Sequence, residues 1–85
     1  MNTLGITAML WFEEDEDASA MQTVKNAAKR YYSKYDHVPT LVELPPQWEQ
    51  YADEIEEQLD GLRVSVSKMI QPRTVAVTHE KQSLS

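Results

Sequence analysis

The chain has 85 residues, of which 41% are apolar, with a formal net charge of −6 and no cysteine. This length allows one domain, because independent domains usually run to roughly 100–150 residues, and the missing cysteines exclude disulfides and thiolate metal sites. The acidic balance disfavours direct contact with nucleic acid or an anionic membrane, since both carry negative charge. We therefore predict a single α/β domain over residues 1–79 and a flexible polar tail over residues 80–85.

Two further features bear on location and assembly. No apolar run approaches the roughly 18 residues that a membrane span needs. Residues 4–12 lack the basic start and the small-residue cleavage site of a signal peptide, and five acids follow them. We therefore expect a cytoplasmic protein. A short chain without disulfides has a thin stability margin, so a homodimer is a physically reasonable expectation as well.

The first predicted element is a strand over residues 4–12, whose alternating side chains are largely apolar on both sides. Leu10 and Phe12 belong to one side, and Met9 and Trp11 belong to the other. Strands that are apolar on both sides are typical of sheets covered on both faces.

Residues 18–35 carry a helical period with one apolar arc and predict the first helix. Asp15 and Asp17 are the candidate N-caps, because a carboxylate can accept hydrogen bonds from the first free backbone N–H groups. Asp36 follows the pattern and tolerates the left-handed conformation that ends many helices. Pro39 then prevents the helix from continuing.

Residues 40–44 form a short β-branched and aliphatic run that predicts a second strand, closed by a proline pair. The second helix is expected to begin near Pro46, since the first turn of a helix tolerates proline. Gly61 marks its end. The remaining residues, 62–79, alternate twice around Pro72 and predict a hairpin.

The element order is therefore β-α-β-α-β-β, which predicts a small α/β (or α+β) fold with a single-layer sheet of about four strands and two helices. Strands separated by single helices favour parallel pairing, and the final hairpin would add an antiparallel strand. The alternative is a split arrangement in which the first strand pairs antiparallel at an edge. Two helices cover only one face of such a sheet. We expect Met9 and Trp11 on the uncovered face, where Trp11 would anchor association with a partner or a second copy.

Five consecutive acids, residues 13–17, connect the first strand to the first helix, at a place where open α/β sheets often hold ligands. Carboxylate oxygens are ligands for Mg²⁺ and Ca²⁺, so Glu13, Asp15 and Asp17 are weak candidates for a metal site. The spacing does not match an EF-hand, and acids before a helix also suit its dipole. We expect no cofactor, and a metal-dependent enzyme or cation-binding protein using this loop is the alternative.

The outer face of the second predicted helix carries Glu49, Asp53, Glu56 and Asp60 in one stripe, and residues 49–60 contain no basic residue. Like charges three or four residues apart destabilise a helix by about 0.2–0.5 kcal/mol per pair. The stripe therefore predicts docking to a protein partner with a basic surface. A second alternative is an acidic inhibitor that mimics nucleic-acid phosphates, and a face that only promotes solubility is the plainest interpretation.

No catalytic motif is present in the sequence. The two glycines, Gly5 and Gly61, exclude a glycine-rich phosphate loop. The two histidines, His37 and His79, have neither a nucleophile motif nor cysteines beside them. Four bases of the first helix flank its apolar arc on both sides, which disfavours nucleic-acid binding: Lys25, Lys29, Arg30 and Lys34. We therefore predict a small acidic, non-enzymatic protein–protein interaction module.

Overall fold

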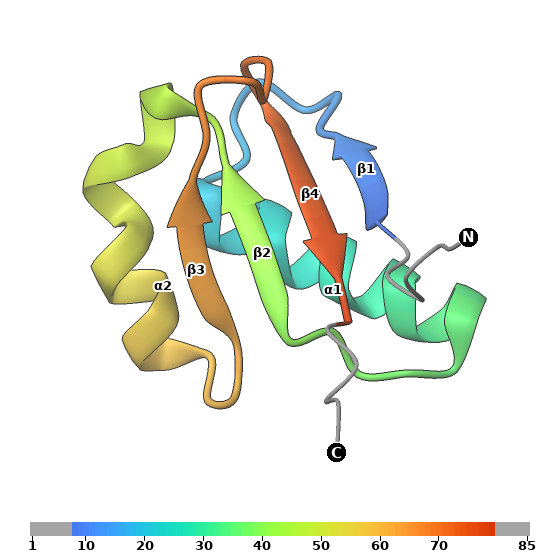
Figure 1. The fold of residues 1–85 in the computed structure, drawn as a ribbon. Helices are drawn as coiled ribbons and strands as arrows, with labels where there is room; N and C mark the ends of the chain where they lie inside the picture. The colour runs from blue at the N-terminus through green and yellow to red at the C-terminus, as the bar shows by residue number, and fades with distance from the viewer. Residues whose placement is uncertain (1–7, 80–85) are drawn as a thin grey trace.

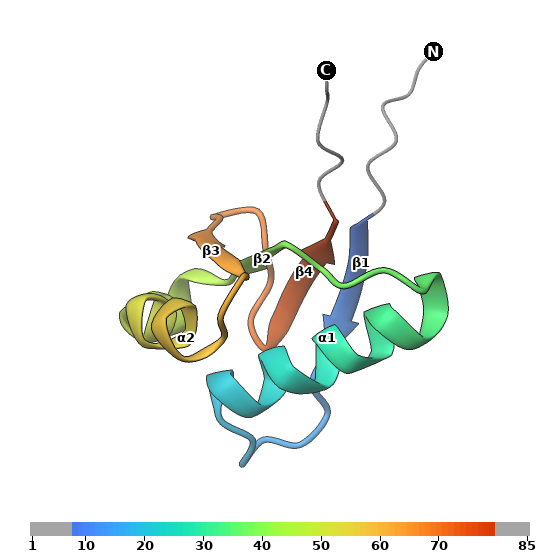
Figure 2. The same ribbon diagram turned by 90° about the horizontal axis from the view of Figure 1, so that it is seen from below.

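The computed structural model describes residues 8–79, which form a four-stranded mixed sheet with one helix against one face and the other along an edge (Figures 1 and 2). The predicted tail over residues 80–85 lies outside the described residues, as does the start of the first predicted strand. The elements are β1 (Ala8–Phe12), α1 (Ala20–Tyr35), β2 (Leu41–Leu44), the 3₁₀ helix η1 (Pro46–Tyr51), α2 (Ala52–Gln58), β3 (Arg63–Val66) and β4 (Thr74–Thr78). The predicted fold class and the order β-α-β-α-β-β are confirmed.

Helix α1 begins after Ser19, so the prediction that Asp15 or Asp17 caps it is wrong. The Ser19 hydroxyl accepts a hydrogen bond from the backbone N–H of Gln22 at 3.0 Å, and its own backbone is extended, as a cap requires. The Asp15 carboxylate instead accepts the backbone N–H of Asp17, outside the helix. At the other end Asp36 adopts the left-handed conformation, with φ of 60°, and so confirms the predicted stop.

The predicted second helix consists of two pieces. Its first part is η1, in which the N–H of Trp48 donates to the carbonyl of Pro45 at 3.0 Å, three residues back. The α-helix proper, α2, begins only at Ala52. Gly61 has φ of +85° in the turn to β3, a conformation that glycine adopts at little cost. No helix in the described part of the chain is long and apolar enough to cross a membrane.

The strand order is β1-β4-β2-β3, which corrects the predicted hairpin. Strands β2 and β3 are parallel, as expected for strands joined by a single helix. Strand β4 does not pair with β3; it lies between β1 and β2 and is antiparallel to both. The connection between β3 and β4 therefore passes across the end of β2 (Figure 1). The split arrangement, with β1 antiparallel at an edge, is the observed one.

The physical reason for this order lies in the side chains of the last two strands. Val75, Ala76, Val77 and Thr78 of β4 are all buried, so this strand is stabilised most by a central position with neighbours on both sides. Strand β3 instead alternates between exposed and half-buried residues, a pattern that suits an edge.

One apolar core lies between the sheet and the helices. Helix α1 contributes four buried side chains to it, and α2 contributes Ile55. The sheet contributes the inward side chains of β1, β2 and β4. The buried core residues are Met9, Ala20, Val24, Ala27, Tyr31, Val42, Leu44, Ile55, Leu62, Val75 and Val77.

Within residues 8–79, no helix lies over the opposite face of the sheet (Figure 2). Paired residues of neighbouring strands point to the same side, so the register defines this face. We call it the uncovered face, and its residues are Ala8, Leu10, Phe12, Leu41, Glu43, Arg63, Ser65, Thr74, Ala76 and Thr78.

The expectation that Met9 and Trp11 lie on the uncovered face is wrong. Met9 is part of the core, and Trp11 is half-buried against it on the helix side. Leu10 and Phe12 occupy the uncovered face instead. Both sides of this strand are apolar, so alternation alone could not assign its inward side. Inside, the Trp11 indole N–H donates to a Glu13 carboxylate oxygen at 3.4 Å.

Candidate interaction surfaces

The acidic loop before α1 uses its carboxylates on its own chain. Glu13 is only 9% exposed; one of its oxygens accepts from the Trp11 indole and the other from the backbone N–H of Asp15 at 3.2 Å. Asp15 in turn accepts from the N–H of Asp17 at 2.9 Å. Among residues 8–79, no three His, Cys, Asp or Glu side chains are grouped so that they could hold a metal ion. Of the three metal candidates, Glu13 and Asp15 therefore use their carboxylates as local caps of the loop, and Asp17 contributes its backbone N–H.

The tertiary structure brings together the two histidines, which sequence analysis treated as isolated. The rings of His37, in the loop after α1, and His79, after β4, stack with centroids 4.9 Å apart and an angle of 5° between their planes. The pair has no third ligand in the described part of the chain, and no nucleophile motif adjoins either residue. The stack joins the end of β4 to the loop that leads into β2.

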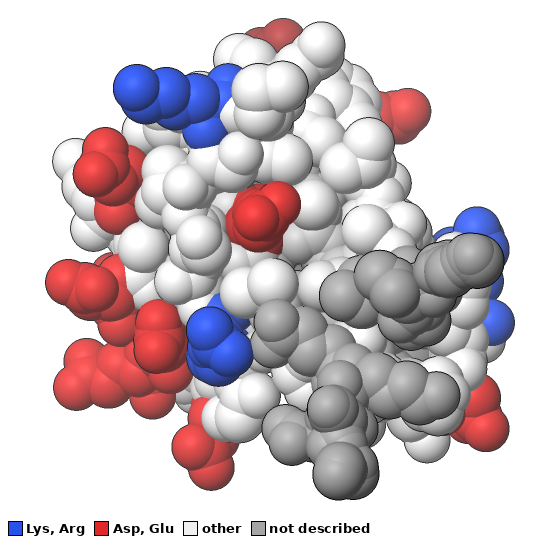
Figure 3. Space-filling model, viewed as in Figure 1, with Lys and Arg blue, Asp and Glu red and all other residues white. Residues whose placement is uncertain are grey.

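The four acids of the predicted stripe are all exposed, but they belong to three elements. Glu49 lies in η1, Asp53 and Glu56 lie in α2, and Asp60 lies in the turn beyond the helix end. Figure 3 shows acidic side chains gathered at one edge of the molecule, over α2. Glu56 also has a structural contact, because its carboxylate accepts the backbone N–H of Val64 at 3.3 Å.

Large apolar side chains stand exposed at one end of the uncovered face. Leu10 is 68% exposed, Phe12 53% and Met69 87%. With Ile70 they line a shallow hollow of about 380 Å³. We call these four residues the apolar patch. The guanidinium of Arg73 lies 5.0 Å from the centre of the Phe12 ring and helps to hold it in place.

Glu43 lies beside this patch, in the middle of the uncovered face. The register sets it between Ala76 of β4 and Ser65 of β3. Its side chain is half-buried, and the structure records no hydrogen bond or ion pair for it among residues 8–79. The patch and Glu43 are not among the site residues predicted from the sequence, because their proximity depends on the position of β4.

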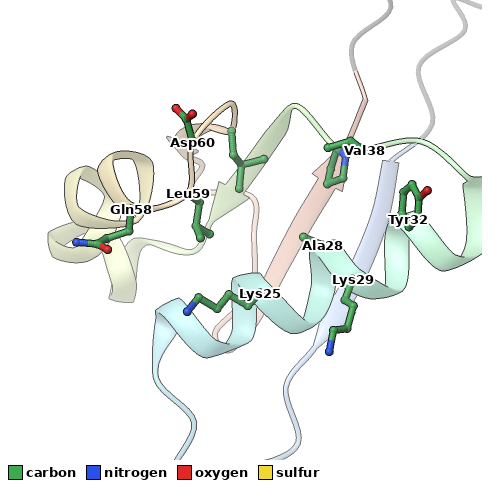
Figure 4. Close-up of a pocket in the computed structure, with 10 residues that line it drawn as sticks. Lys25, Ala28, Lys29, Tyr32, Val38, Gln58, Leu59 and Asp60 are labelled. Carbon is green, nitrogen blue, oxygen red and sulfur yellow. The ribbon is translucent and has the colours of Figure 1, made fainter.

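A groove of about 440 Å³ opens on the helix side of the molecule, between α1 and the turn after α2 (Figure 4). Its walls are α1 on one side and the turn on the other, with the loop before β2 at one end. Figure 4 shows Lys25 and Lys29 on the α1 wall, and Gln58 and Asp60 on the opposite wall. The other lining residues are Ala28, Tyr32, Val38, Pro39, Leu59 and Leu62.

Comparison of the chain with protein-family models, curated proteins and solved structures gives no match.

Proposed function

We propose that this protein is a non-enzymatic interaction module whose uncovered sheet face binds a protein partner through apolar contacts and basic side chains. The observation that carries this proposal is the exposed apolar patch beside the half-buried carboxylate of Glu43.

The apolar half of the surface favours burial against another protein. Contiguous exposed apolar side chains are uncommon on monomeric proteins and often mark binding sites. Phe and Met are enriched at the centres of interfaces, where they fill hollows of the partner. Each large side chain that leaves water contributes about 1.5–3 kcal/mol. Burial of Leu10, Phe12 and Met69 would therefore contribute favourably to the free energy of binding, against which the entropic costs of association must be set.

The charge of Glu43 selects among partners. A carboxylate that is covered without a counter-charge costs several kcal/mol, so the partner needs a lysine or arginine opposite it. A second copy of this chain, placed face to face with its two-fold axis near Glu43, would bring two carboxylates together. A different protein with a basic residue therefore fits this face better than a homodimer does.

The acidic residues of η1 and α2 add further negative charge beside the uncovered face. They lie beyond the β3 edge, and Figure 3 shows them at the border of the view that contains the uncovered face. Glu49 and Asp53 are exposed there, so a basic partner seated over Glu43 can continue onto them. Such contacts act mainly on the association rate and on its salt dependence.

The test is affinity capture with the full tagged chain from native lysate at low and moderate salt. One variant removes the apolar patch (Leu10→Ser with Met69→Ser), a second neutralises the central acid (Glu43→Gln), and a third neutralises Glu49, Asp53, Glu56 and Asp60 together. The control is Ser33→Ala, at an exposed position of α1 that belongs neither to this face nor to the groove between α1 and the turn after α2.

We expect one partner that the parent chain and the Ser33→Ala control retain and that the patch variant loses. Both charge variants should bind it more weakly. Melting curves should show that all variants stay folded. A partner that the patch variant retains in full would refute the proposal. So would a dimer of the parent chain in sedimentation velocity that the patch variant breaks, because the face would then be covered by a second copy.

A further inference from the structure

We infer that the groove between α1 and the turn after α2 is a second binding site, and that it takes a peptide segment with an apolar side chain flanked by acidic residues. The inference is independent of the proposed function, because the groove lies on the helix side of the sheet and has basic groups where the uncovered face has a carboxylate.

The groove has the shape and lining of a site for an apolar side chain. Its volume of about 440 Å³ is within the range of roughly 300–1,000 Å³ that is usual for ligand pockets. Pro39 and Leu62 are buried beneath it, whereas Tyr32 and Val38 are exposed at its edge. Exposed apolar residues around an apolar hollow favour an occupant that buries them from above.

The positive charges on the α1 side of the groove favour an acidic ligand. Lys25 and Lys29 are one helical turn apart, so their side chains emerge on the same side of α1. Both are exposed, and among residues 8–79 the structure records no ion pair for either. Two unpaired ammonium groups beside an apolar hollow complement carboxylates that flank an apolar side chain.

The residues on the opposite side of the groove favour one orientation of a bound peptide. Gln58 and Asp60 lie there, and they offer an amide and a carboxylate in place of ammonium groups. A bound segment would therefore turn its acids toward α1 and its N–H groups or a base toward Asp60. A segment whose acids faced the other wall would meet like charge, which costs affinity.

A second copy of this chain fits the groove less well than a peptide does. The groove is concave, and a convex occupant is needed to fill it, whereas two copies meeting groove to groove would leave a gap between them. A short helix or an extended strand of another protein is convex on the required scale. With partners on both sides of the sheet, the chain would act as an adaptor.

The experiment uses the full chain and two fluorescent peptide arrays. In one array a central leucine, isoleucine, phenylalanine or tryptophan is flanked by glutamates, and in the other the same residues are flanked by lysines. Binding is measured by fluorescence anisotropy. The variants are Lys25→Gln with Lys29→Gln, and separately Val38→Ser. The matched control is Arg30→Gln with Lys34→Gln, which removes two bases of α1 that do not line the groove.

We expect the glutamate-flanked peptides to bind the parent chain and the Arg30/Lys34 control equally well. Their affinity should fall by about tenfold or more in the Lys25/Lys29 variant and also fall in the Val38 variant. Amide chemical shifts should change around the groove and not around Leu10 or Glu43. The patch variant Leu10→Ser with Met69→Ser should bind these peptides normally, so that failure of one proposal is distinguishable from failure of the other.

Three outcomes would overturn the inference. The first is a lack of binding by every glutamate-flanked peptide, and the second is equal binding of the two arrays. The third is equal loss in the Lys25/Lys29 variant and its control, which would indicate a general effect of net charge. A concentration-dependent dimer that only the groove variants break would assign the groove to a second copy and would overturn it as well.

Discussion

At the N-terminus of α1, the Ser19 hydroxyl accepts the Gln22 N–H, and the Ser19 carbonyl accepts both the N–H and the hydroxyl of the buried Thr23 at 2.9 Å. Ser19→Ala removes the first of these bonds and leaves a helix N–H without a protein acceptor. We expect the free energy of unfolding to fall by about 1 kcal/mol, measured by urea denaturation. Ser19→Asp should retain most of the stability, because a carboxylate also caps.

The matched control for this change is Ser33→Ala, at an exposed position within the same helix. Alanine has the highest helix propensity, so this substitution should be neutral or slightly stabilising. Equal losses at both positions would mean that the cap contributes nothing specific at Ser19.

At the scale of elements, β3 is an edge strand whose outer side meets α2. The N–H groups of Arg63 and Ser67 donate to the Thr40 and Leu44 carbonyls on the β2 side, so that of Val64 points outward to the Glu56 carboxylate. Glu56→Ala removes this acceptor, so the backbone N–H of Val64 at the sheet edge can bond only to water. We expect a loss of about 0.5–1 kcal/mol in the free energy of unfolding, measured by urea denaturation.

Two comparisons separate the hydrogen bond from the charge. Glu56→Gln keeps an acceptor oxygen and should resemble the parent chain, and Glu57→Ala removes a neighbouring exposed charge without touching β3. If Glu56→Gln destabilises as much as Glu56→Ala does, the negative charge matters and the acceptor does not.

For the whole molecule, the structure divides apolar side chains into those that hold the fold and those that remain for partners. Ile55 is 1% exposed and attaches α2 to the core, whereas Leu10 is 68% exposed on the uncovered face. Ile55→Ala should cost about 2–5 kcal/mol, a large part of the roughly 5–15 kcal/mol that stabilises a typical domain. Leu10→Ala should change stability by no more than about 0.5 kcal/mol.

Thermal and urea unfolding followed by circular dichroism would measure both changes. A loss at Leu10 as large as that at Ile55 would contradict the described division, since it would mean that the uncovered face is buried in the isolated protein. The same measurement on the patch variant would establish whether binding losses reflect the surface or the fold.

Local patterns were enough to predict each helix and strand. The helical period, Asp36 and Pro39 placed α1 and its end, because caps and breakers act within a few residues. The same local rules failed where two signals compete: Ser19 displaced Asp15 and Asp17 as the cap, and a proline start gave η1 before α2. Strand pairing was mispredicted for β4 because register and neighbour choice depend on contacts between distant residues.

The candidate surfaces also differ in how far they could be predicted from local sequence patterns. Composition and periodicity were enough to predict the class of fold, the element order, and the exposed acids along η1 and α2. The side of β1 that faces the helices could not be predicted in this way, because both sides are apolar and the pairing with β4 in the folded sheet selects between them. The tertiary structure also decided the apolar patch beside Glu43 and the groove beside Lys25, whose residues are far apart in the chain and meet only through the packing of the sheet and helices.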